Sequence, residues 1–364
     1  MKKIFVFLCS LSLSTLLSCS NENLSGQEGI TETIFFVVAA NGDLYKEGEM
    51  KATAMLHSLP RDKELFLLKE TSIDEGCVLL HKTLNGTDTL AVTHEKTFKE
   101  NLEKAVSYIS SVHPTNVSLI IFSHATGWYP SKRIKSRSAI VDDYTEISLQ
   151  ELHEAVGRLR YKTIVFESCN MGGIECLYQF HDICDFIIAS STELLSPGFL
   201  LLYRQGIGNL ADREGALSFA QRYTSHVKKA SVPYNSCAVA IYQTNHANEL
   251  FNFFRRTKNI TRLRADITNT QQLHRNNEEE VFYDLESFLT HTELSENLKR
   301  ELHGILEKTV IYKYNTHDFL PSHEGFLIKE YCGLSVFDFL SPSPYLAYYK
   351  KTGFGKFLFS SSRE

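Results

Sequence analysis

Short, nearly continuous apolar runs recur along the chain, and segments with helical spacing separate them. The clearest runs are residues 34–39 (IFFVVA) and 117–122 (VSLIIF). A strand in a parallel sheet is buried on both faces, so its sequence is apolar throughout instead of alternating. Strands that alternate with helices predict an α/β fold, with a mostly parallel central sheet covered by helices on both faces.

The expected elements follow one another in a regular order. The chain is 43% hydrophobic, which is enough apolar surface for a large core. We expect one globular domain over residues 32–257, and a partly helical, partly irregular C-terminal extension over 258–364 that packs on it. Strands are expected at 34–39, 65–68, 77–83, 117–122, 162–166, 186–189 and 237–242, and helices at 44–59, 95–112, 148–159, 172–180, 214–229, 248–256, 282–289 and 294–308.

The N-terminus is typical of an exported protein. Two lysines precede an apolar stretch over residues 4–17, which is short for a permanent transmembrane helix and suits a signal peptide. The stretch runs into Leu16-Leu17-Ser18-Cys19, which resembles a bacterial lipobox and implies a lipid on Cys19. Residues 1–18 would be the signal peptide and 19–31 a polar tether. We expect an exported bacterial lipoprotein of the cell envelope, at the outer membrane or cell surface; the alternative is an ordinary secretory signal with a chance cysteine.

Charge and cysteine content narrow the function further. The formal net charge is -5, so the chain has no basic surplus, and nucleic acid is not an expected partner. Six of the eight cysteines lie beyond residue 19, and none has CxxC spacing. An exported protein can pair its cysteines, but buried free thiols fit this chain at least as well.

A histidine and a cysteine each follow a clearly predicted strand. His124 follows the strand at 117–122, and Cys169 follows the strand at 162–166. Functional groups in open α/β sheets gather at the carboxyl ends of strands, so neighbouring strands would bring these side chains together. An imidazole beside a thiol raises the fraction of thiolate and can later protonate a leaving amine. Taken singly, each residue has a structural alternative: a packed thiol, or a strand-end histidine.

Four segments, in consistent order, resemble the clostripain-like cysteine peptidases. Residues 120–128 (IIFSHATGW) are similar to the family's strand and histidine segment, and 165–175 (VFESCNMGGIE) to its cysteine segment. Asp142-Asp143 followed by 147–152 (ISLQEL) resembles the stretch between them, and 189–198, with its Ala-Ser and Pro-Gly pairs, resembles the loop after the next strand. The chain has no GxSxG, HExxH or Walker A motif that would suggest another chemistry.

The resemblance implies a caspase-like three-layer sandwich and a peptidase that cleaves proteins or peptides after Arg or Lys. It implies Cys169 as the nucleophile and His124 as the acid/base, with no obligatory third residue and no required cofactor. Backbone N–H groups of Cys169 and Ala125 would hold the oxyanion. Two rival functions stay open: a catalytically silent, caspase-like lipoprotein that binds peptides or partners, and a transpeptidase that uses the same two residues.

Several candidate pocket residues have a structural alternative. Glu167 replaces an aspartate that helps bind the basic P1 side chain in the family; its alternative is a strand-end carboxylate held in a salt bridge. Glu193 is a second candidate for the pocket. Ser190 and Ser191 would line the pocket or cap the strand. Trp128, the only tryptophan, would form a cleft wall or pack in the core.

The segment between the two motifs carries two further predictions. Lys132, Arg133, Lys135 and Arg137 lie in a polar, self-repelling loop. Clostripain-like enzymes are commonly matured by cleavage in this part of the chain, so the resemblance implies self-processing after one of these residues. The alternative is a basic loop that binds the anionic membrane surface. Asp142-Asp143 would suit calcium, with a solvated turn as the alternative.

Overall fold

The computed structural model describes residues 29–40, 42–70, 76–93, 97–129, 139–141, 146–257, 269–275, 281–321 and 323–360. Several predictions lie outside these residues: the signal peptide at 1–18, the lipid on Cys19, most of the tether at 19–31, the processing loop at 132–137, and calcium at Asp142-Asp143. None of the helices in the described ranges is long and apolar enough to cross a membrane.

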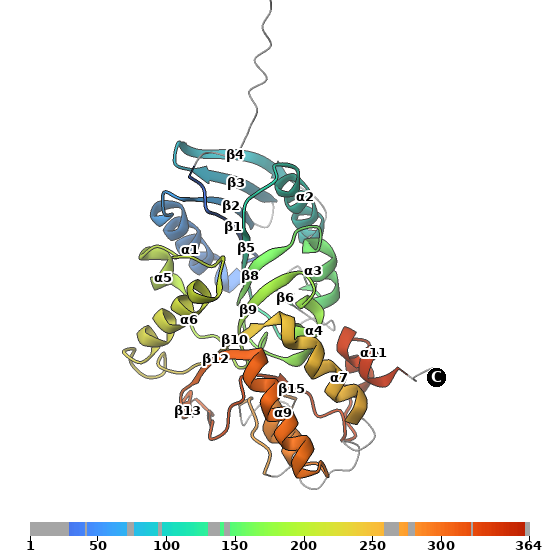
Figure 1. Cartoon of the computed structure of the whole chain (residues 1–364). Helices are drawn as coiled ribbons and strands as arrows, with labels where there is room; N and C mark the ends of the chain where they lie inside the picture. Colours follow the sequence, from blue (N-terminus) through green and yellow to red (C-terminus); the bar gives the residue numbers. More distant parts are fainter. Residues whose placement is uncertain are drawn as a thin grey trace, which may run out of the picture.

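A nine-stranded sheet forms the centre of the described structure (Figure 1). The five inner strands, from β9 to β2, are parallel, and the strands outside them are antiparallel. The mostly parallel inner sheet is therefore confirmed. Across the sheet the order is β12 (Val310–Asn315), β10 (Ala238–Gln243), β9 (Cys184–Ser190), β8 (Tyr161–Glu167), β5 (Val117–Phe122), β1 (Glu32–Val38), β2 (Lys63–Glu70), β3 (Cys77–Thr83) and β4 (Gly86–Thr93).

Helices cover both faces of this sheet (Figure 1). Successive residues of the inner strands point to opposite faces. In β1, Ile34 and Phe36 belong to one core, and Phe35 and Val37 to the other. This is the expected three-layer sandwich. The first core lies under α1 (Tyr45–Ser58), α5 (Leu200–Arg204) and α6 (Arg213–Val227), and the second under α2 (Phe98–Ser111), α3 (Leu149–Val156), α4 (Ile174–Phe180), α7 (Ala247–Thr257) and α9 (Glu296–Thr309).

Two helices begin at capping boxes that are readable in the sequence. The Thr97 hydroxyl accepts a hydrogen bond from the Glu100 N–H, and the Glu100 carboxylate accepts one from the Thr97 N–H. Ser148 and Glu151 repeat the arrangement at the start of α3. Such reciprocal bonds satisfy N–H groups that the first turn of a helix leaves without partners. The caps therefore fix where α2 and α3 start.

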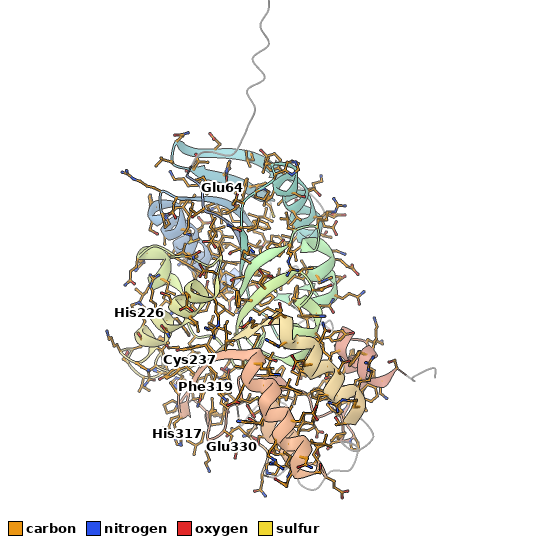
Figure 2. All side chains as sticks on the ribbon, viewed as in Figure 1. Glu64, His226, Cys237, His317, Phe319 and Glu330 are labelled. Atoms are coloured by element: carbon orange, nitrogen blue, oxygen red, sulfur yellow. The ribbon has the colours of Figure 1, made fainter. Side chains whose placement is uncertain are left out.

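The C-terminal segment is part of the same structure. It supplies β12, which pairs with β10 in the central sheet (Figure 1). Cys237, labelled in Figure 2, directly precedes β10, and its carbonyl accepts a hydrogen bond from the Thr316 N–H at 2.9 Å. Further along, the Ser335 N–H donates to the Gly172 carbonyl at 2.9 Å, close in sequence to Cys169. Residues beyond 257 thus support the loop that follows the predicted nucleophile.

Short elements complete the described chain. They connect the main strands and helices or pack at the C-terminal end. They are η1 (Gly42–Leu44), β6 (Ile140–Val141), β7 (Glu146–Ile147), η2 (Thr244–His246), β11 (Tyr283–Asp284), α8 (Leu285–Thr290), β13 (Asp318–Phe319), β14 (Phe326–Leu327), β15 (Ser335–Val336), α10 (Leu346–Tyr349) and α11 (Gly353–Phe359).

Candidate active site

The predicted histidine and cysteine leave the sheet side by side. The strands β5 and β8 are parallel neighbours, and Phe122 pairs with Glu167 at their carboxyl ends. His124 and Cys169 each come two residues after this pair. The intervening hydroxyls of Ser123 and Ser168 lie 3.2 Å apart and share a hydrogen bond. The expectation that the two strands are neighbours is therefore confirmed, and both residues lie at the carboxyl ends of the inner strands.

Three loops meet around Cys169. Gly127 has φ 64°, and a Cβ atom there would lie 2.6 Å from the Asn170 carbonyl oxygen, so only glycine fits this approach. On the other side, the Asn170 N–H donates to the Thr192 carbonyl at 3.0 Å. The Leu194 N–H lies 3.4 Å from the Cys169 sulfur. The loops after β5 and β9 thus pack against the two sides of the loop that carries Cys169.

Cys169 is the most accessible thiol among the described residues. The six cysteines in those ranges are thiols outside any disulfide; five are buried, and Cys169 is partly exposed. Burial raises the pKa of Cys176, Cys184 and Cys332 well above the usual thiol range, and it raises the pKa of Cys237 to about 12. Because reactivity needs both exposure and thiolate, Cys169 is the best placed of these cysteines to act as a nucleophile.

A carboxylate holds the predicted histidine. The Nε2 atom of His124 lies 2.9 Å from Oδ1 of Asp43, in the η1 turn that follows β1. β1 is the other neighbour of β5, so this side chain comes from the same edge of the sheet. With Nε2 bound to Asp43, Nδ1 is the ring nitrogen left to exchange a proton with a thiol. The sequence analysis missed Asp43, although its place after an apolar strand is the same signal that identified His124.

The structure corrects the role predicted for Glu167. Its side chain is buried at the end of β8, and its cation partner is Lys51 of α1, not a group open to substrate. The Phe199 N–H donates to the carboxylate at 2.6 Å, and the Tyr203 hydroxyl at 2.5 Å. Burial raises the pKa of Glu167, and these partners act in the opposite direction. The alternative, a strand-end carboxylate in a salt bridge, describes this residue.

Three other pocket candidates also have internal roles. The Ser190 hydroxyl donates to the Ala238 carbonyl at 3.0 Å, and the Ser191 hydroxyl to the Gly172 carbonyl at 3.0 Å. Both serines are buried, so they tie strand and loop backbones together instead of lining a pocket. Trp128 is buried, and its ring packs 4.6 Å from that of Phe337 and 4.8 Å from that of Tyr349. Its core-packing alternative is the one observed.

Glu193 remains near the site. It precedes Leu194, whose N–H faces the Cys169 sulfur, and its carboxylate pairs with the Arg275 guanidinium. Both charged side chains are partly exposed. Of the two acidic pocket candidates, Glu193 is therefore the one that solvent reaches, and it already binds a guanidinium. The backbone N–H groups of Ala125 and Cys169 belong to the loops after β5 and β8, and their role in binding the oxyanion stays a prediction.

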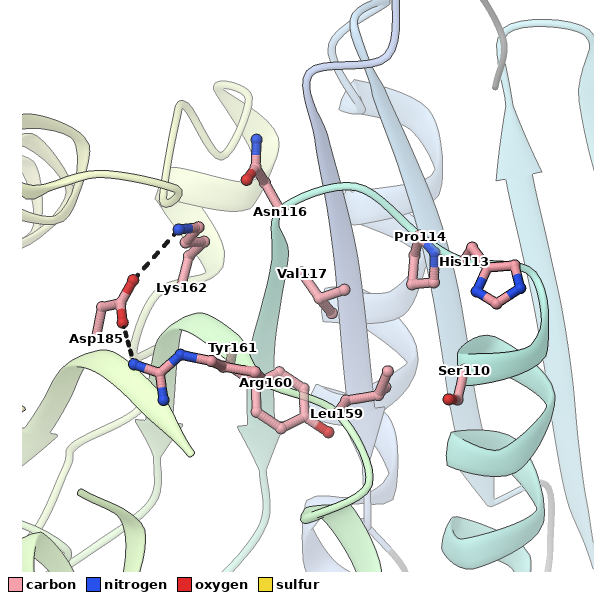
Figure 3. Close-up of a pocket in the computed structure, with 10 residues that line it drawn as sticks. All are labelled: Ser110, His113, Pro114, Asn116, Val117, Leu159, Arg160, Tyr161, Lys162 and Asp185. Atoms are coloured by element: carbon pink, nitrogen blue, oxygen red, sulfur yellow. Dashed lines mark hydrogen bonds and ion pairs between the residues drawn. The ribbon is translucent and has the colours of Figure 1, made fainter. Parts of the chain in front are cut away.

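A cavity of about 410 Å³ lies at the amino ends of the inner strands, opposite the predicted site (Figure 3). It lies where β5, β8 and β9 begin, and Asp185 there pairs with Arg160 at 2.6 Å and Lys162 at 3.3 Å. None of the predicted site residues lines this cavity. Within the described ranges, no group of three or more His, Cys, Asp or Glu side chains is arranged to hold a metal ion.

A mostly parallel sheet with a histidine and a cysteine after neighbouring strands is the arrangement expected of a cysteine peptidase. The sequence model of the clostripain family matches residues 87–349, so the chain belongs to the clostripain family. The chain has no match among curated proteins.

Solved structures of C11 proteases share the fold. An inactive zymogen C11 protease from Parabacteroides distasonis superposes with a TM-score of 0.75 at 19% identity, over 92% of this chain and 99% of that one. A secreted C11 cysteine protease from Bacteroides thetaiotaomicron gives 0.76 at 17% identity, over 90% and 99%. A complex of a secreted C11 protease from the same organism with an irreversible peptide inhibitor gives 0.74 at 16%, again over 90% and 99%.

Proposed function

We propose that this chain is an endopeptidase in which Cys169 is the nucleophile and His124 the acid/base. The thiolate sulfur attacks the scissile carbonyl carbon, and the N–H groups of Ala125 and Cys169 stabilise the oxyanion. The imidazolium then gives its proton to the leaving amine. Water, deprotonated by His124, hydrolyses the acyl-enzyme and restores the thiol. The observation that carries this proposal is the register of β5 and β8, which sets both residues two positions past one strand pair.

We further propose that the enzyme cleaves after Arg or Lys and that Glu193 binds the basic P1 side chain. Two observations support this. The carboxylate already pairs with an arginine, Arg275, and the next residue, Leu194, has its N–H beside the Cys169 sulfur. A substrate guanidinium would take the place of Arg275, and the charge-assisted contact would favour Arg and Lys over neutral residues.

A peptide-library digest tests this function. Purified wild type is expected to cleave on the carboxyl side of Arg and Lys, and Glu193→Gln to lose that preference about tenfold or more. Electrophilic labelling near neutral pH is expected to modify Cys169 first. A folded wild type that labels at Cys169 and cleaves no peptide in the library would refute the endopeptidase.

Asp43 is expected to act as a positioning residue for His124. Asp43→Ala should lower kcat/KM about 10- to 100-fold and slow the alkylation of Cys169, because the imidazole loses its fixed orientation. Asp43→Asn, which keeps an acceptor oxygen, should retain most of the activity.

A second surface pair provides the control for Asp43. His153 Nε2 and Asp182 Oδ1 lie 3.1 Å apart, on elements that carry none of the proposed catalytic residues. Asp182→Ala should leave both kinetic readouts unchanged. If Asp43→Ala behaves like Asp182→Ala, the carboxylate does not position the histidine.

Self-processing is expected in the basic loop at residues 132–137. An enzyme that cleaves after Arg and Lys can cut its own exposed chain there, so purified wild type should separate into two fragments on a denaturing gel. Cys169→Ala should remain one chain, and so should a variant with Gln at Lys132, Arg133, Lys135 and Arg137. A wild type that is active as a single chain would exclude maturation at this loop.

The protein is expected to be held at the membrane by a lipid on Cys19. Cys19→Ser should move it from the membrane fraction to the soluble fraction, because the acyl chains are the anchor. Cys9→Ser, in the same N-terminal segment but outside the lipobox, should leave the fractionation unchanged. Tight membrane association of Cys19→Ser would show that another feature holds the protein there.

A further inference from the structure

A buried ammonium group lies at the carboxyl ends of the two strands that precede the proposed catalytic residues. Lys51, in the middle of α1, has a side chain that is 1% exposed and pairs with Glu167. Its Nζ atom also lies 2.8 Å from Glu47 Oε1 and 4.1 Å from the centre of the Phe122 ring. Phe122 ends β5 and Glu167 ends β8, so the ammonium contacts the last residue of each strand.

The loop beside the nucleophile covers this ion pair. Gly198 has φ 54°, and a Cβ atom there would lie 2.5 Å from Glu167 Oε1 and 2.9 Å from Lys51 Nζ. The same loop carries Leu194, whose N–H faces the Cys169 sulfur. Glu167 is therefore close to the proposed nucleophile both in the sequence and in the fold. Its carboxylate is already paired with an internal cation, Lys51.

The length of the Glu167 side chain is part of this arrangement. The family position is an aspartate, and glutamate adds one methylene group to the arm. The longer arm lets one carboxylate reach Lys51, the Tyr203 hydroxyl and the Phe199 N–H together. A carboxylate with these partners gains little from a second cation, and the Lys51 charge would repel one.

We propose that Lys51 is a specificity-determining residue of this peptidase. It takes the place of a basic substrate side chain at Glu167, so recognition of Arg or Lys depends on Glu193 alone. Wild type should therefore prefer a basic P1 residue to a neutral one of the same shape less strongly than a variant in which the Glu167 charge has no internal partner. This inference rests on the proposed function, and it deepens it by naming the residue that limits P1 selectivity.

Matched peptides that differ only at P1 test the role of Lys51. The P1 residues are lysine and norleucine, which has a similar shape and no charge. The readout is the ratio of their kcat/KM values. Lys51→Met should raise this ratio at least tenfold over wild type, because it frees the Glu167 charge. The double variant Lys51→Met/Glu167→Gln removes both charges and should return the ratio to the wild-type value.

The chain contains a matched control pair. Lys63 and Glu32 form another buried ion pair, 2.5 Å apart, where β1 and β2 begin, at the opposite edge of the sheet. Lys63→Met removes a buried ammonium without touching the proposed site, so it should leave the lysine/norleucine ratio unchanged. A folded Lys51→Met with the same ratio as wild type would overturn the proposal.

A binding measurement covers the case in which Lys51→Met folds poorly. Lys51→Ala leaves room for an external cation beside Glu167, so n-propylammonium should raise its Tm more than n-propanol does. The effect should vanish in Lys51→Ala/Glu167→Gln. If n-propylammonium does not stabilise Lys51→Ala more than n-propanol does, Glu167 does not bind an external cation, and the proposed role of Lys51 is wrong. If folded wild type cleaves no peptide, the proposed function fails first, whatever the amine result.

Discussion

Replacing Cys169 with alanine is expected to reduce kcat/KM by about 10,000-fold or more. Loss of a nucleophile removes the covalent route, and the oxyanion groups and His124 cannot replace a missing sulfur. The thiol is partly exposed and accepts a hydrogen bond from the Leu194 N–H at 3.4 Å, and alanine is smaller than cysteine, so the fold should survive the change. Initial rates on a peptide with a basic P1 residue, together with a thermal unfolding curve, measure both expectations.

Another thiol gives the matched control for this prediction. Cys237 is buried just before β10, and burial raises its pKa to about 12, so it is neither reachable nor readily ionised. Cys237→Ala should keep the wild-type kcat/KM. Near wild-type turnover in Cys169→Ala would show that the nucleophile is elsewhere. An equal loss in both variants would point to damage to the fold and not to catalysis.

The inner sheet was predictable because burial on both faces leaves a strong local signal. The apolar runs at 34–39 and 117–122 correspond to β1 and β5, and His124 lies just past the carboxyl end of β5. Functional groups in such sheets gather at the carboxyl ends of the strands, which predicts that the strand before Cys169 is a neighbour of β5, as β8 is. The signal is local in sequence, so it needs no knowledge of the neighbouring elements.

The edge strands were harder to predict. β4 was missed: Asn85-Gly86 marks a tight turn, but residues 87–89 (TDT) are polar and exposed, so the strand lacks an apolar alternation. β12 lies in the segment that the sequence predicts to be partly helical and partly irregular, because its residues are partly exposed and its pairing with β10 spans about 70 residues of sequence. Edge strands bury less, so their apolar pattern is weaker.

The pocket was the least predictable part of the site. Whether a carboxylate binds substrate or an internal cation depends on what lies across from it. Lys51 is 116 residues away from Glu167 and reads, in sequence, as an ordinary helix residue. Ser190 and Ser191 show the same limit, since their acceptors are the carbonyls of Ala238 and Gly172, which are 48 and 19 residues away in the sequence. Residue type, spacing and the family resemblance indicate the proposed catalytic pair, whereas the roles of the other residues depend on their three-dimensional partners.

Replacing Glu167 with alanine is expected to destabilise the fold by about 3–5 kcal/mol. The change leaves the buried Lys51 ammonium with only Glu47 as an acidic partner, and it deprives the Tyr203 hydroxyl and the Phe199 N–H of their acceptor. Urea unfolding measures the loss. The Cys169→Ala background excludes self-cleavage during the experiment.

The double variant Lys51→Met/Glu167→Gln separates the charge from the packing. It removes both charges and keeps side chains of similar size, so it should be closer to wild type than Glu167→Ala is. The reason is that a buried ion pair adds little net stability to the fold, whereas a single buried charge without its partner destabilises it strongly. A loss below about 1 kcal/mol in Glu167→Ala would mean that the two groups do not depend on each other. The proposal that Lys51 holds the Glu167 carboxylate would then be wrong, and Glu167 would again be a candidate for binding the substrate.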